Sequence, residues 1–253
     1  MKRCHKSYLI INRIGFFLPL VIWIIVKYGF NIEDRYLPSP KDVLMVFGTL
    51  TPNILLHSLV SFLRLFVGFV IGSLLGIFLG ILLYKSKTTY GLLYPTIQSI
   101  RAIPPYALIP FFLLWFGFSE IGKFITLISG VLFNLSIASY QALLVIEERY
   151  ILFFKGIGKD TRNFILSFSL PYVIERILPT LRFSLSTAIG LVVVAEMLGS
   201  QMGLGYVIQT SRSTYSIDVI FLSAFLFGII NFIVDKLLVL LWKSIVFWKK
   251  NQE

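Results

Sequence analysis

Six apolar runs constrain the fold of this chain more than any other feature, because each is close to the length that crosses a bilayer. A helix needs about 20 mostly apolar residues to span the hydrocarbon core. The chain is 57% hydrophobic and 14% charged, whereas soluble domains carry about 25% charged residues. The sequence therefore predicts an all-α integral membrane protein with about six transmembrane helices. The predicted spans are residues 14–30, 55–84, 91–116, 123–146, 177–198 and 217–241.

The N-terminus begins with basic residues and continues into the first apolar run. The pattern is similar to a secretory signal, but no small-residue cleavage site of the Ala-x-Ala type follows it. We therefore expect an uncleaved first span. Residues 1–50 are predicted to form this span and an extracytoplasmic segment, and residues 51–248 a core with a cytoplasmic loop at 147–176.

Positive charge in short loops indicates the orientation, because cytoplasmic loops are enriched in Lys and Arg. With the N-terminus inside, fourteen of the 23 Lys and Arg residues fall on the cytoplasmic side and four on the other side. Both termini are therefore predicted to be cytoplasmic. The same bias accounts for the net charge of +11, so no nucleic-acid partner is expected.

The sequence lacks the residue sets that most catalytic and metal sites need. One cysteine and two distant histidines exclude an internal disulfide framework and argue against a metal cluster. A phosphate-binding loop of the G-x-x-x-x-G-K-[S/T] type is missing, since Phe124 and Asp160 follow the two Gly-Lys pairs. The sequence also contains no nucleophile set, aspartate pair or HExxH motif that would predict an enzyme. Any work on a solute must then be driven by another subunit or by an ion gradient.

Ionisable side chains inside the predicted spans are costly, by about 2.5–3.5 kcal/mol at the bilayer centre. The deep ones are Arg64, Arg101, Arg182 and Glu196. Arg182 and Glu196 lie fourteen residues apart on one span, about 21 Å along a helix, so they cannot pair directly. Nothing in the sequence pairs Glu196 with Asp235 on the next span. These side chains either line a translocation path, or bond to other helices and reach the headgroups.

Gly68, Gly72, Gly76 and Gly80 recur every four residues in the second predicted span. Such a face of small residues lets the backbone of another helix approach closely. We favour packing within one subunit over a dimer seam as the role of this face.

Pro104, Pro105 and Pro110 interrupt the third predicted span. Broken helices in membranes are tolerated where they are buried in protein or line a cavity. A role of this segment in lining a solute path is therefore one interpretation, and an ordinary kink is the other.

A polar, cationic segment at 155–171 separates two apolar runs. It contains Gly156 and Gly158, which permit a tight turn or the close approach of another backbone, and it ends at Leu170-Pro171. A simple connector could be much shorter. We therefore expect a partner outside the membrane to grip this loop, with an ordinary positively charged loop as the alternative.

Several segments, in this order, are similar to one family of transport proteins. They are LPSP at 37–40, SFLRLFVGF at 61–69, IRAIPPYALIPFFLLWFG at 100–117, LPTLRFSLSTAIG at 178–190 and AEMLGSQMGLGY at 195–206. The set, which covers most of residues 37–242, resembles the permease subunit of binding-protein-dependent ABC importers. The resemblance is to the branch that serves nitrate, sulfonate and taurine.

The cytoplasmic loop of that family reads E-A-A-x-x-x-G, nine residues, then I-x-L-P. Aligning Leu170-Pro171 on the L-P places the family glycine on Gly158, which matches, and the I position on Phe168. The E-A-A positions fall on 152–154, where Leu-Phe-Phe stands instead. Three large apolar side chains thus replace an acidic residue and two small ones. We hypothesise that the partner has a wide, apolar groove that receives them.

The resemblance implies a type I ABC importer permease fold in the cell (inner) membrane. It also implies a pore that is a homodimer or pseudo-dimer, with two ATP-binding subunits inside and a substrate-binding protein outside. ATP is then used by the partner, and this chain binds no cofactor directly. The solute would be a sulfonate, taurine, nitrate or a vitamin precursor.

Two groups of residues follow as candidates. The first group is expected to couple to the ATPase: Leu152, Phe153, Phe154, Lys155, Gly156, Gly158, Lys159, Asp160, Leu170 and Pro171. The second group is expected to line the translocation path: Arg101, Pro104, Pro105, Arg182 and Glu196.

Two functions from other classes remain as alternatives. A membrane-embedded enzyme is disfavoured because the sequence offers no nucleophile or metal set. An ion-coupled secondary transporter is disfavoured because such proteins often carry inverted repeats, and no clear internal repeat is present.

Overall fold

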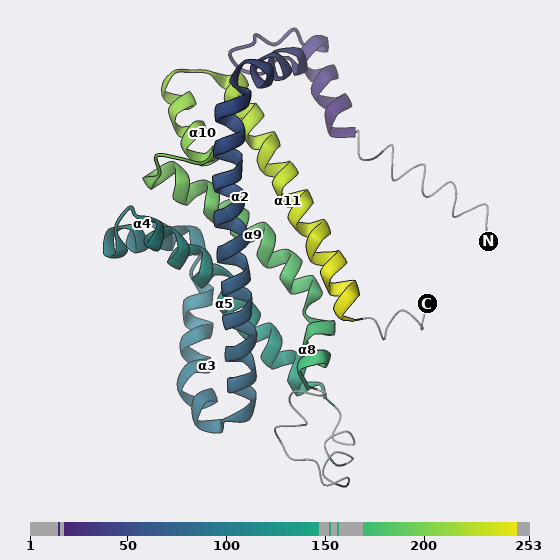
Figure 1. The fold of residues 1–253 in the computed structure, drawn as a ribbon, viewed down its shortest axis with the longest axis vertical. Helices are drawn as coiled ribbons and strands as arrows, with labels where there is room; N and C mark the ends of the chain where they lie inside the picture. Colours follow the sequence, from purple (N-terminus) through teal and green to yellow (C-terminus); the bar gives the residue numbers. More distant parts are fainter. Residues whose placement is uncertain (1–14, 16–17, 147–151, 153–155, 157–168, 247–253) are drawn as a thin grey trace, which may run out of the picture.

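Every regular element in the described part of the computed structural model is a helix. The structure describes residues 15, 18–146, 152, 156 and 169–246. A short apolar helix, Leu18–Gly29, comes first. It is followed by α2 (Pro40–Lys85), α3 (Lys87–Ala102), α4 (Pro105–Phe116), α5 (Glu120–Leu144), α8 (Leu170–Arg176), α9 (Leu178–Gly199), α10 (Leu204–Ser213) and α11 (Ile217–Ile245) (Figure 1).

Four of these helices are long and apolar enough to cross a membrane. They are the Asn53–Lys85 part of α2, then α5, α9 and α11, and the bent pair of α3 and α4 can supply a fifth. All five correspond to predicted spans. The first predicted span, 14–30, contains the shorter helix Leu18–Gly29, and part of it lies outside the described residues. The count of six spans and the cytoplasmic location of both termini therefore stay predictions.

The LPSP segment begins α2 through a reciprocal cap. The Ser39 hydroxyl accepts a hydrogen bond from the backbone N–H of Asp42 at 3.1 Å, and the Asp42 carboxylate accepts one from the backbone N–H of Ser39 at 3.3 Å. Pro40 fits the first turn, where its missing N–H costs nothing. The hydrogen bond from the Ser39 side chain also lowers the pKa of Asp42, which lies outside the apolar part of α2. This arrangement fixes where the longest helix starts.

The third predicted span is broken at one point only. The helices α3 and α4 meet at 104° across the Ile103-Pro104 break, and α4 projects sideways from the other helices at mid-height (Figure 1). Pro95 and Pro110 lie inside α3 and α4, respectively, without ending them. The continuous run at 91–116 is thus two helices, because the consecutive prolines at 104 and 105 cannot continue the hydrogen-bond ladder of α3.

The glycine face of α2 packs against α5. A Cβ on Gly76 would lie 2.8 Å from the Leu132 carbonyl oxygen, and one on Gly80 would lie 2.5 Å from the Ser139 Cβ. Gly68 and Gly72 face Leu127 and Val131 of the same helix in the same way. The close approach confirms the expectation of packing within one subunit.

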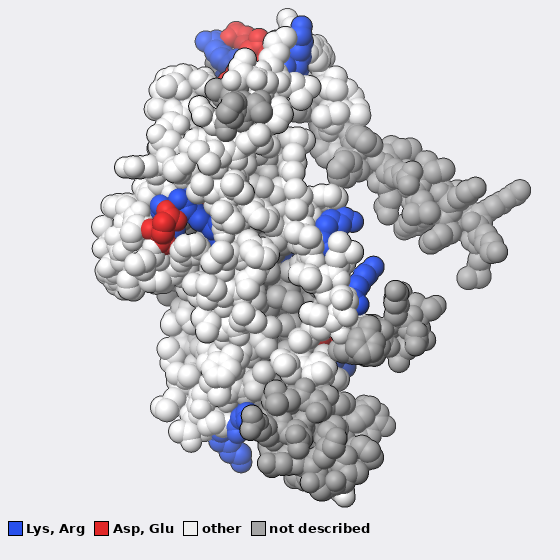
Figure 2. All heavy atoms as spheres, viewed as in Figure 1, with Lys and Arg blue, Asp and Glu red and all other residues white. Residues whose placement is uncertain are grey.

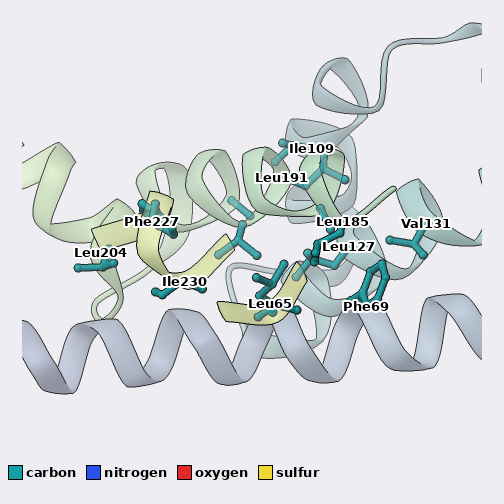
Figure 3. Close-up of a cluster of buried hydrophobic side chains, with 14 of the residues drawn as sticks. Leu65, Phe69, Ile109, Leu127, Val131, Leu185, Leu191, Leu204, Phe227 and Ile230 are labelled. Carbon is teal, nitrogen blue, oxygen red and sulfur yellow. The ribbon is translucent and has the colours of Figure 1, made fainter. Parts of the chain in front are cut away.

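A cluster of buried apolar side chains joins these helices (Figure 3). Leu65 and Phe69 of α2 meet Leu127 of α5 and Leu185 of α9 within it, and Ile230 comes from α11. The outward-facing surface is also largely apolar, and few charged side chains appear on the face in Figure 2. Apolar side chains inside and outside alike are typical of a protein whose solvent is partly lipid.

Candidate functional site

The predicted coupling loop is described only at its end and at two positions inside it. Leu170 and Pro171 form the first turn of α8. Leu152 and Gly156 are exposed. The remaining coupling candidates, Phe153, Phe154, Lys155, Gly158, Lys159 and Asp160, lie outside the described residues. Their role in coupling stays a prediction.

The helix at the end of the loop, α8, is anchored in the bundle. Val173 of α8 and Ile177 just after it are almost fully buried, in a small cluster with Leu143 and Ile146 at the end of α5. The Trp242 indole N–H of α11 donates to the Ile174 carbonyl oxygen at 2.9 Å. This end of the loop is therefore held by three membrane helices, since α9 continues directly from α8.

Glu196 lies in a buried polar network at the other end of α9. Its side chain is 1% exposed, and it accepts hydrogen bonds from Arg64 Nη1 at 2.8 Å and from the Ser61 hydroxyl at 2.8 and 2.9 Å. The backbone N–H of Gly205 donates to it at 2.9 Å. Arg64 also contacts Glu120 of α5 at 2.6 Å. The network joins α2, α5, α9 and α10.

The two glycines of the GLGY segment at 203–206 are needed because the backbone passes close to Glu196. Gly203 has φ +116, a conformation that side chains rarely adopt, and a Cβ there would run into the Glu196 carboxylate. A Cβ on Gly205 would lie 2.6 Å from the Glu196 Cβ. His57 accepts a hydrogen bond from the backbone N–H of Gly203 at 3.0 Å. The glycines allow the start of α10 to fold tightly over the carboxylate.

Arg182 is paired with Asp235. Two hydrogen bonds of 2.7 and 2.8 Å join the guanidinium of α9 to the carboxylate of α11. The pair lines an open groove of about 870 Å³ between these helices, together with Ser186 and Asn231. The groove therefore contains one cation and one anion that neutralise each other.

Arg101 lies in a second hollow, beside the break between α3 and α4. Its Nε donates to the Asn134 side-chain oxygen at 3.1 Å, and Asn134 in turn donates to the Gly130 carbonyl oxygen at 3.1 Å. The hollow has a volume of about 380 Å³ and is lined by parts of α3, α4, α5 and α9, including Pro105. Phe183 borders both this hollow and the groove at Arg182.

Four of the five candidate path residues fall into two places, and the fifth, Pro104, precedes α4 as its N-cap and lines neither hollow. Arg101, Pro105 and Arg182 border two neighbouring hollows, whereas Glu196 is enclosed with Arg64. Sequence reasoning missed both interhelical pairs. The sequence does indicate that an acidic side chain in a span needs a cation at a similar depth in the membrane. Depth alone does not indicate which helices are neighbours, so it does not identify the partner.

No cluster of three or more metal-ligating side chains occurs among the described residues. The polar side chains around Glu196 and the two hollows carry guanidinium, ammonium, imidazole, carboxylate, amide and hydroxyl groups.

Curated relatives match nearly the whole chain. SsuC of Bacillus subtilis, named for aliphatic sulfonates transport, is 29% identical over 94% of this chain and 88% of its own length. SsuC of Escherichia coli is 30% identical over 89% of each chain. The taurine transport system permease protein TauC of Escherichia coli is 25% identical over 85% of this chain and 81% of its own length.

Solved structures share the fold. One inward-facing form of the MetNI methionine ABC transporter matches with a TM-score of 0.66 at 17% identity, over 78% of this chain and 98% of that chain. A second inward-facing form matches with a TM-score of 0.59 at 20% identity, over 75% and 96%. The fold prediction is confirmed at this level.

The sequence model of one family matches residues 72–246, from Gly72 within α2 to the residue after α11. Its description is "Binding-protein-dependent transport system inner membrane component". The matched region is most of the chain, and it agrees with the multi-pass helical structure. The protein therefore belongs to the family of inner membrane components of binding-protein-dependent transport systems.

Proposed function

We propose that this chain is the permease subunit of an ATP-driven importer and forms the path for a small solute of the sulfonate or taurine type. The observation that carries the proposal is the family match over 72–246, joined to full-length relatives that are named for sulfonate and taurine transport. Nitrate and vitamin precursors are the alternative candidates for the transported solute. A binding protein outside the membrane delivers the solute.

In this proposal, the loop at 147–176 couples the permease to ATP-binding subunits, which consume the ATP. The anchoring of α8 supports the idea, since Val173 and the Trp242 bond tie the end of the loop to α5 and α11. A displacement of the loop is then transmitted to membrane helices instead of being absorbed by a flexible hinge.

The proposed pore contains two copies of this chain. A second membrane subunit of different sequence is the other possibility, because a pseudo-dimer satisfies the same architecture. The mass of the purified, cross-linked complex distinguishes a pore with two copies of this chain from a pore with one copy and a different membrane subunit. A complex with a single copy of this chain and no related subunit would contradict both.

The test is reconstitution of this chain in proteoliposomes with its proposed ATP-binding subunit and binding protein from the same organism. We expect uptake of the solute that the binding protein carries. This uptake should occur only when ATP is supplied on the side of the membrane that holds the ATP-binding subunit. Uptake that follows an imposed ion gradient without ATP would instead identify an ion-coupled secondary transporter. Chemical conversion of the solute would identify a membrane-embedded enzyme.

A further inference from the structure

The guanidinium of Arg101 differs from the other two guanidinium groups in the predicted spans, those of Arg64 and Arg182, in having no acidic partner among the described residues. Arg64 contacts Glu120 and Glu196, and Arg182 contacts Asp235. None of the residues that line the hollow at Arg101 is acidic. Its Nε is bonded to the neutral Asn134, which leaves the Nη groups without a hydrogen bond among the described residues.

The depth of Arg101 makes this lone charge costly. It lies fourteen residues after Lys87, the first residue of α3, which is about 21 Å along a helix axis. The hydrocarbon core is about 30 Å thick. A membrane surface at Lys87 would place Arg101 too deep for its charge to reach the headgroups on that side, so a hollow lined by protein and water suits this charge better than lipid does.

The broken helix points to the same hollow. Irregular backbone at membrane depth is tolerated where it is buried in protein or lines a cavity, and Ile103 and Pro105 at the break both line this one. The volume of about 380 Å³ falls within the range of about 300–1,000 Å³ that is usual for small-ligand sites. Two independent observations, the lone cation and the break, thus coincide.

The donors in the hollow are arranged for an oxyanion. Asn134 is fixed by its bond to the Gly130 carbonyl and in turn orients Arg101 through Nε. The Nη edge is then free to donate two parallel bonds, the geometry that guanidinium groups use with oxyanions. The Tyr106 hydroxyl, which lies against Gly190 and has no hydrogen bond in the described part of the chain, is another donor in the lining.

We propose that this hollow is a binding site for the anionic headgroup of the transported solute, with Arg101 as its charge partner. The inference rests on the proposed transport function and adds the charge and location of the site. The groove at Arg182 is not such a site, because Asp235 already neutralises that guanidinium. A sulfonate, with three equivalent oxygens and one negative charge, fits the donors at Arg101.

The experiment uses the complex of this chain with its ATP-binding subunit in phosphatidylcholine nanodiscs, with sodium ethanesulfonate as the probe. A ligand that binds the folded state raises the unfolding temperature. We expect ethanesulfonate to raise it beyond sodium chloride at equal ionic strength. Arg101→Gln should weaken this effect at least about tenfold in apparent affinity, because a charged hydrogen-bonding group is lost.

Asn134→Asp is the second variant, since it changes the amide to a carboxylate of the same shape and gives Arg101 an internal anion. It should weaken the ethanesulfonate effect as Arg101→Gln does, and Arg101→Lys should retain part of it. Lys87→Gln, at the exposed start of the same helix, is the matched control and should respond as the wild type does.

Three results would overturn the proposal. The first is a wild-type complex that ethanesulfonate does not stabilise beyond chloride. The second is an equal response of Arg101→Gln, Asn134→Asp and the wild type. The third is loss of the effect when phosphatidylglycerol is added to the nanodisc, which would assign Arg101 to a lipid phosphate. The binding readout needs no ATP, so a failure of ATP-driven uptake alone would count against the proposed function and not against the site.

Discussion

At the scale of single residues, Arg64, Arg182 and Glu196 of the predicted spans are each paired with a side chain of opposite charge. Glu196 accepts from two side chains and one backbone N–H, so its carboxylate is enclosed without an unmet bond. Arg64 divides its donors between Glu196 and Glu120. Enclosed pairs of this kind leave a costly buried charge when one partner is removed.

Glu196→Gln should therefore lower the free energy of unfolding by roughly 3 kcal/mol, the lower end for a broken buried pair, since Arg64 keeps Glu120. Reversible unfolding in mixed detergent micelles measures it. Glu33→Gln is the control, because its pair with Arg35 is exposed on both sides and should change stability by less than about 1 kcal/mol. Equal losses in the two variants would contradict the structural role of Glu196.

Close packing at Gly80 gives a second prediction at this scale. Gly80→Ala should destabilise the protein by about 1–3 kcal/mol through overpacking, because the new Cβ would meet Ser139 Cβ and the Ser136 carbonyl oxygen at 2.5 and 2.6 Å. Gly91→Ala in α3 meets nothing within 4 Å and should be neutral or stabilising by up to about 1 kcal/mol, from helix propensity. Thermal unfolding of both variants compares them, and a stabilised Gly80→Ala would contradict the packing of α2 on α5.

At the scale of elements, α8 is short but strongly connected. It forms the end of the predicted loop at 147–176, continues into α9 and is bonded to α11 through Trp242 and Ile174. Figure 1 places it at the same end of the molecule as the turn between α2 and α3. In the proposed function, this location agrees with a role at the membrane surface that would face the ATP-binding subunit.

Trp242→Phe keeps an aromatic ring but removes the hydrogen bond to α8. One net hydrogen bond of about 0.5–1.5 kcal/mol corresponds to about a 2- to 10-fold change in an equilibrium. We expect the ratio of ATP hydrolysed to solute imported to rise by a factor in this range in proteoliposomes. Trp115→Phe, at an exposed site on α4, should leave the ratio unchanged, and a rise in that control would show that the effect is not specific to α8.

At the scale of the whole molecule, the chain is one part of a larger assembly. The loop at 152–154 carries Leu-Phe-Phe where the family has Glu-Ala-Ala, and Leu152 is exposed. An exposed apolar residue outside the membrane is stabilised when a partner covers it. The proposed partner is the ATP-binding subunit with an apolar groove.

Replacing Leu152, Phe153 and Phe154 together by Ala should reduce copurification of the ATP-binding subunit by about tenfold or more, since each buried apolar side chain contributes about 1.5–3 kcal/mol. Pull-down from detergent extracts measures it, with uptake as the second readout. The control replaces Phe30, Leu44 and Met45, which are exposed on segments before the apolar part of α2. An intact complex with normal transport in the loop variant would disprove apolar docking.

Much of the fold was accessible from the sequence, because the bilayer sets the length and polarity of each span. Five of the six predicted spans correspond to helices in the structure, and the glycine spacing predicts the packing within the subunit that α2 and α5 show. The family followed from motifs at 37–206 and from the end of the loop at Leu170-Pro171. These are local signals, carried by periodicity, composition and short spacing.

Only the tertiary structure decided which charges meet. Arg64 and Glu196 are separated by 132 residues and Arg182 and Asp235 by 53, and no local pattern brings them together. The same holds for Arg101, which has no acidic partner in the described part of the chain, a fact that is visible only when the neighbours of α3 are known. The sequence determines that a charge lies in the membrane and must be compensated, whereas the packing of the helices determines whether another side chain or a solute compensates it.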